Sequence, residues 1–96
     1  MSINHGVISG HLTRDPVSVG KKSPVALMTV ASNRNQERAD FIEVKAIGTT
    51  AEALLNNVEK GDKVTFSYRL ESFQYPDQAT GQTVYGQEVV IQKAEF

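Results

Sequence analysis

In the segment from Asp40 to Ile47, the aromatic Phe41 and the basic Lys45 are an even number of residues apart, as side chains on one face of a β-strand are. Polar and apolar residues alternate there, so Phe41, Glu43, Lys45 and Ile47 are predicted on one face of a strand and Ile42, Val44 and Ala46 on the other. A phenyl ring on a polar face is unfavourable in water unless it packs on something. Stacking on an unpaired base, with a cation nearby for a phosphate, is one such use. Capping an open end of the fold or joining a subunit contact is the alternative for Phe41.

A predicted β-hairpin supplies a second aromatic set. Turn-forming residues in 77–82, with Thr80-Gly81-Gln82 at the tip, separate two extended stretches. Phe73 and Tyr75 precede the turn and share a face by parity, while Tyr85 follows it. We expect Tyr75 to face Tyr85 across the hairpin. The two rings then either offer stacking platforms or merely pack on each other.

Basic residues are expected to line the same groove. Four lie in predicted loops and one lies on a strand face: Lys21, Lys22, Arg34, Arg38 and Arg69. Each alone is typical of a solvated surface, but together with the aromatics they form a plausible channel. Glu43 and Glu71 share the strand faces and would repel phosphate, which predicts weak to moderate binding.

Residues that could perform catalysis are sparse. The chain has no cysteine, which excludes disulfides and thiolate chemistry. His5 and His11 lie on the predicted first strand without further ligands at metal-site spacing, Ser9 has no partner base, and no phosphate-cradling glycine motif is present. We therefore expect no enzyme, no metal or other cofactor, and no small-molecule substrate.

The elements that would position these residues are mostly strands. Extended patterns cover residues 3–12, 25–31, 40–47, 63–75 and 84–95. A stripe of Ala51, Leu54, Leu55 and Val58 predicts one short helix, with Thr50 as its N-cap and Gly61 as its stop. This order predicts an all-β OB-fold, a five-stranded Greek-key barrel with one short helix between strands 3 and 4.

Length and composition bound the remaining possibilities. Ninety-six residues suit one domain, 1–96, and the formal net charge of −1 gives no overall basic signature. The N-terminus lacks a signal-peptide pattern, and no apolar run approaches the roughly 20 residues of a membrane span. We expect no membrane association and a cytoplasmic location.

The chain resembles the bacterial and phage single-stranded DNA-binding protein family over nearly its whole length. The order and spacing of several segments carry the resemblance: Val7 to Pro16, Asp40 to Val44 with Gly48, Ala51-Glu52, Lys60 to Val64, and Thr80 to Gln82 through Tyr85 to Glu88-Val89-Val90. It implies an OB-fold that wraps single-stranded DNA on stacking aromatics and usually assembles as a homotetramer. By this resemblance Phe41 and Tyr75 stand at stacking positions.

Some positions depart from the family pattern. Ile47 stands at a position that is usually aromatic in the family, and Asn35 stands where some relatives carry an aromatic. Glu43 and Glu71 stand where relatives often carry basic residues. We also expect no acidic C-terminal tail of the kind through which many members recruit partners. The departures lower the expected affinity without affecting the fold.

Two functions follow as hypotheses. The first is binding and protection of single-stranded DNA, without strong sequence preference, in replication, recombination or repair. The second is an accessory or protein-interaction module with weak DNA binding, similar to the primosomal replication protein. Apolar residues on both faces of the first strand, with Val7 opposite Ile8 and Leu12, further predict a homo-oligomer, a dimer or tetramer.

Overall fold

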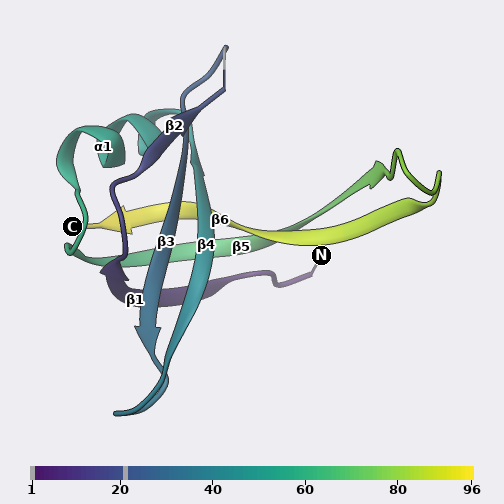
Figure 1. The fold of residues 1–96 in the computed structure, drawn as a ribbon. Helices are drawn as coiled ribbons and strands as arrows, with labels where there is room; N and C mark the ends of the chain where they lie inside the picture. The colour runs from purple at the N-terminus through teal and green to yellow at the C-terminus, as the bar shows by residue number, and fades with distance from the viewer. Residues whose placement is uncertain (1, 21) are drawn as a thin grey trace.

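The chain folds into a barrel with one helix at its end and a long projecting hairpin (Figure 1). The computed structural model describes residues 2–20 and 22–96. Their elements are, in order, β1 (Gly6–Leu12), β2 (Val17–Val19), β3 (Val25–Asn33), β4 (Ala39–Ile47), α1 (Thr49–Asn57), β5 (Lys63–Pro76) and β6 (Thr83–Glu95).

Five strands close into a ring. The sheet order is β1-β5-β6-β4-β3-β2, and an additional β1–β3 pairing closes the first five of these strands into the ring and leaves β2 outside it. Helix α1 connects the third and fourth strands of that ring, β4 and β5. The predicted OB-fold, a five-stranded barrel with one helix at this place, is confirmed.

Strand β2 was not anticipated from the sequence. It has three residues and pairs along the edge of β3, with Val17 opposite Leu27. Three residues are too few to display an alternation, and β1 ends before Asp15-Pro16 as expected.

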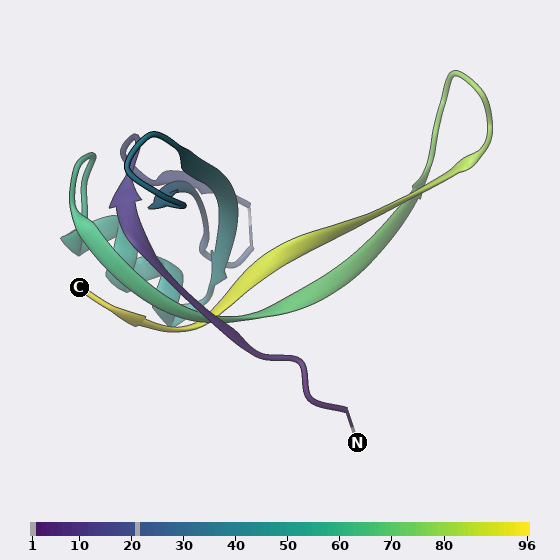
Figure 2. The same ribbon diagram turned by 90° about the horizontal axis from the view of Figure 1, so that it is seen from below.

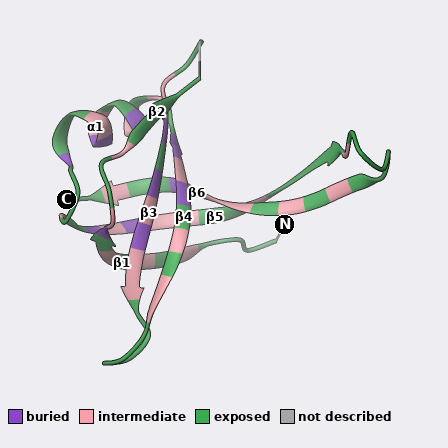
Figure 3. Cartoon of the chain, viewed as in Figure 1, coloured by how far each residue is buried: buried purple, intermediate pink, exposed green. Residues whose placement is uncertain are grey.

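Alternation along the barrel strands produces the core. The inward side chains include Met28 and Val30 on β3, Val44 and Ala46 on β4, and Phe66 on β5, all buried. Ala51, Leu54 and Val58 from the helix join the same cluster, so α1 covers one end of the barrel (Figure 3). The helical stripe was therefore predicted correctly.

Both predicted helix boundaries were wrong. The N-cap is Gly48, which makes no side-chain capping hydrogen bond, and Thr50 lies inside the helix. The helix ends at Asn57, before the predicted stop. Gly61 instead lies in the turn that precedes β5, where its N–H donates to the Leu12 carbonyl at 2.8 Å.

The hairpin continues well beyond the barrel. Strands β5 and β6 run for 14 and 13 residues, and residues 71–88 extend from the barrel as a two-stranded ribbon, here called the arm (Figure 2). Asn4 ties the N-terminal segment to its base: its side-chain amide donates to the Leu70 carbonyl at 2.7 Å, and its Oδ1 accepts from the Leu70 N–H at 3.0 Å. The arm contributes nothing to the buried core in the described residues.

Candidate nucleic-acid interface

The predicted faces of β4 are confirmed. Phe41, Glu43 and Ile47 are exposed and Lys45 is half-buried on the outer face, whereas Val44 and Ala46 are buried. Phe41 exposes 67% of its surface. A phenyl ring so exposed on a strand has room for a flat partner on its open side.

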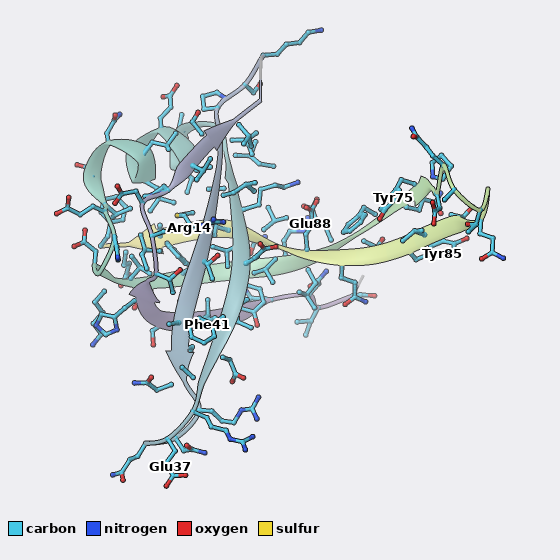
Figure 4. The ribbon with its side chains drawn as sticks, viewed as in Figure 1. Arg14, Glu37, Phe41, Tyr75, Tyr85 and Glu88 are labelled. Atoms are coloured by element: carbon cyan, nitrogen blue, oxygen red, sulfur yellow. The ribbon has the colours of Figure 1, made fainter. Side chains whose placement is uncertain are left out.

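The outer face of β4 continues across the sheet. Lys45 pairs in register with Val90 of β6, and Val90 pairs with Arg69 of β5, so the two cations flank Val90 on the outside of the barrel. Along β5, strand parity carries this face from Arg69 through Glu71 to Phe73 and Tyr75 on the arm. Phe41 and Tyr75 lie on different parts of this face, the first on the barrel and the second on the arm (Figure 4).

The arm carries aromatics on both of its faces. Phe73 and Tyr75 share one face, with ring centroids 6.1 Å apart and planes 10° from parallel. Phe73 lies opposite Gly86, and its ring occupies the space where a Cβ of residue 86 would stand. Tyr75 and Tyr85 remain exposed by 51% and 74%.

The expectation that Tyr75 faces Tyr85 was wrong. Tyr75 pairs with Val84, and Tyr85 pairs with Gln74. Directly opposed residues of an antiparallel pair share a face, so Tyr85 lies on the reverse side of the arm from Tyr75. The two rings do not pack on each other as a cross-strand pair, and each keeps an open surface.

A broad open hollow of about 750 Å³ runs along the arm. The aromatic residues among its lining are Phe73 and Tyr85, and the others are Ser72, Gln74, Gly86 and Gln87. Such a lining offers flat faces together with amide and hydroxyl groups, the two kinds of partner that an unpaired base can use.

The strand cations are held by carboxylates. Lys45 Nζ lies 2.7 Å from Glu88 Oε1, and Arg69 Nε lies 3.5 Å from Glu71 Oε2. Glu71 and Glu88 are direct cross-strand partners. Like charges opposite one another are destabilising, and the two cations offset that repulsion.

In the loop between β3 and β4, Arg34 is also paired. Its Nε donates to Asp40 Oδ2 at 3.2 Å, and its Nη2 donates to Asp40 Oδ1. The hydrogen bond and the negative charge of Asp40 raise the pKa of the Arg34 guanidinium, which stays fully charged. Asn35 caps the loop through its Oδ1, which accepts from the N–H groups of Glu37 and Arg38. The Asn35 side chain therefore stabilises the backbone of this loop.

The loop cations do not form one group. Arg34 and Arg38 lie beyond the C-terminal end of β3, whereas Lys22 lies before its start, and Lys21 falls outside the described residues. Nine residues of strand separate these ends by roughly 30 Å. That these cations line one channel for DNA stays a prediction.

One cation that lies beside the outer face of β4 was missed in the sequence analysis. Arg14 lies in the connection between β1 and β2 (Figure 4). It lines a small hollow of about 100 Å³ together with Leu27, Glu43, Lys45 and Glu88. Among the described residues Arg14 makes no ion pair. Strand parity could not find it, because Arg14 follows the end of β1 and reaches this face from a loop.

Residues 2–20 and 22–96 contain neither a cluster of metal ligands nor a membrane-spanning helix. No three histidine or acidic side chains there gather as metal ligands. Within the same residues, no helix has the length and apolar character needed to cross a membrane.

Comparison with known proteins finds one family. The model of the single-strand binding protein family matches residues 3–96. The chain is 32% identical to the single-stranded DNA-binding protein of Clostridium perfringens, with 98% of the chain and 65% of that protein covered. It is 37% identical to single-stranded DNA-binding protein 1 of Streptococcus pyogenes, covering 98% of the chain and 78% of the relative. The protein of that name from Streptococcus pneumoniae is 39% identical, with coverages of 98% and 65%. The chain thus spans between about two thirds and four fifths of these relatives.

Proposed function

The chain belongs to the single-strand binding protein family, and on that premise we propose that it binds single-stranded DNA without strong sequence preference and protects it. The exposed aromatics of the outer face and the arm carry the proposal. Phe41, Tyr75 and Tyr85 leave half or more of their surface open in the isolated chain. Unpaired bases can cover such rings, whereas the bases of a duplex are already stacked.

Phosphate contacts complete the proposed interface. Lys22 and Arg38 are exposed, and neither makes an ion pair with another described residue. Both are available to neutralise backbone phosphates at either end of β3. Lys45, Arg69 and Arg34 would have to exchange a carboxylate partner for a phosphate. This exchange supports the weak to moderate affinity expected from the sequence. We propose Lys21 as a further contact on its sequence position alone.

The accessory-module alternative is not favoured. The relatives described above are all named as single-stranded DNA-binding proteins, and their similarity covers nearly the entire chain. The paired cations are the one observation in favour of the alternative, since they reduce the positive charge available to DNA. They lower affinity and leave the aromatic platforms untouched.

We further propose that the protein acts as a homo-oligomer built around β1. Residues 6–9 of β1 pair only with β5 in the described part of the chain, so their other edge is free. Val7 on this strand exposes 64% of its surface. A second copy of the same strand would satisfy the edge hydrogen bonds and cover Val7 in a symmetric contact.

Fluorescence anisotropy with a labelled oligothymidine tests the main proposal. The same oligonucleotide annealed to its complement serves as the duplex control, and both titrations are run at two salt concentrations. We expect preferential binding of the single strand at both. Equal binding to the two forms, or no binding to either, would overturn the proposal.

A further inference from the structure

The small hollow beside Lys45 carries an inference that rests on the proposed function and deepens it. Its charged lining residues are Arg14, Lys45, Glu43 and Glu88, so that two cations and two carboxylates balance in the free protein, and its apolar lining residues are Leu27, Met28, Val44 and Val89. Its volume of about 100 Å³ equals the share of about three water molecules in liquid water. A group of phosphate size therefore fits.

We propose that this hollow binds one backbone phosphate of single-stranded DNA through Arg14 and Lys45, and that the Glu88 carboxylate stays paired with Lys45 until that phosphate displaces it. Lys45 and Glu88 are within 2.7 Å and keep only 24% and 33% of their side chains exposed. The pair is close, hydrogen-bonded and partly shielded from water. A phosphate presents the same kind of anionic oxygen to Lys45 as the Glu88 carboxylate does.

The fold maintains this competition. Strands β4 and β6 run parallel here, with Lys45 in register with Val90, two residues from Glu88 on the same face. Glu88 lies opposite Glu71, which favours keeping a cation beside it. The Lys45 side chain therefore rests against Glu88 in the free protein, and Arg14 is left as the unpaired cation of the hollow.

Competition between the Glu88 carboxylate and a DNA phosphate for Lys45 should change how binding affinity depends on salt. A lysine that exchanges a carboxylate for a phosphate leaves an unpaired carboxylate, which takes a cation back from solution. The Lys45–Glu88 pair then adds nothing to the net release of ions. Without the carboxylate, the same lysine contributes one phosphate contact, about 0.7 in the slope of log affinity against log salt on a single strand.

The test is a double-mutant cycle on oligothymidine binding, followed by anisotropy at four salt concentrations. Glu88→Gln, which keeps the side-chain shape, is expected to tighten binding roughly two- to fivefold at low salt, the range of one partly exposed ion pair. Its slope should steepen by about 0.7. In a Lys45→Gln background the gain from Glu88→Gln should disappear, because the competition no longer exists. Arg14→Gln should weaken binding in both the original and the Glu88→Gln protein.

Glu52→Gln, at an exposed position of α1, makes the same charge change away from the sheet and is the matched control. A gain for Glu88→Gln no larger than for Glu52→Gln, or one that persists in the Lys45→Gln background, would overturn the inference. Thermal melting by circular dichroism establishes that each variant is folded before it is titrated. Failure of the unmodified protein to bind any single strand would instead overturn the proposed function.

Discussion

The phenyl ring of Phe73 lies over the backbone of Gly86, its direct partner across the arm. This close approach leaves the ring parallel to that of Tyr75 at a centroid distance of 6.1 Å. A side chain at position 86 would displace the phenyl ring, so the glycine fixes how the arm presents its two stacked aromatics.

Removing a proposed platform should weaken binding without unfolding the protein. Phe41→Ala and Tyr75→Ala are each expected to cost about 1–3 kcal/mol of single-strand binding, the value of one base–aromatic stack. Both rings lie outside the barrel core, so the melting temperature should change little. Anisotropy titration and thermal melting measure the two effects. A large drop in melting temperature in either variant would show that the ring stabilises the fold.

Substitution of Gly86 should affect DNA binding, whereas substitution of Gly10 should affect the stability of the fold. A Cβ at Gly86 would meet the far end of the Phe73 ring, which can rotate away, whereas a Cβ at Gly10 would meet the backbone carbonyl of Ala31. Gly86→Ala should therefore weaken DNA binding with little loss of stability. Gly10→Ala should lower the free energy of unfolding by about 1–3 kcal/mol or more, the cost of overpacking. Urea denaturation compares the two variants, and equal losses of stability would contradict this assignment.

Reversing a charge on the outer face should strengthen binding. Glu43 is exposed between Phe41 and Lys45 on the face confirmed for β4. Glu43→Arg removes a repulsion and adds a cation, so affinity should rise and the salt slope should steepen by about 0.7 for one added contact. Glu43→Gln, which only removes the negative charge, should give a smaller gain. Unchanged affinity in both variants would mean that the bound DNA does not pass this position of β4.

Loop cations should act through charge alone. Arg38→Gln and Lys22→Gln are expected to lower affinity less than loss of an aromatic, and to make the salt slope shallower by about 0.7 per phosphate contact. Lys60→Gln, in the turn after α1, is the control and should leave the slope unchanged. A loss that is independent of salt would argue against phosphate contacts by these loops.

Assembly should depend on β1. Val7→Lys places a charge on the exposed face of the free edge strand, where a symmetric contact would bring two such charges together. We expect a homo-oligomer for the unmodified chain and a shift toward monomer for the variant, both measured by sedimentation at tens of micromolar. A monomer in both cases would remove the oligomer proposal and leave the binding proposal intact.

Local patterns sufficed for much of this molecule, and pairings between distant segments did not. The alternation of β4 predicted which face carries Phe41 and Lys45, because that face depends only on neighbours within one strand. The Lys45–Glu88 pair joins residues 43 positions apart through a parallel strand contact, which no local pattern encodes. A single residue of register decides whether Tyr85 shares a face with Tyr75, and the sequence left that register open.

The separation of the arm from the barrel core divides the molecule into regions of different local stability. The buried residues of β5 and β6 nearest the arm are Phe66 and Val90, while the arm is held by the ladder hydrogen bonds of its two strands and by surface contacts. Its amide hydrogens should exchange with solvent through local opening, long before those of Val30 or Val44, whose exchange requires opening of the barrel. Substitutions in the arm can therefore alter what it contacts while the folding equilibrium of the barrel stays where it was.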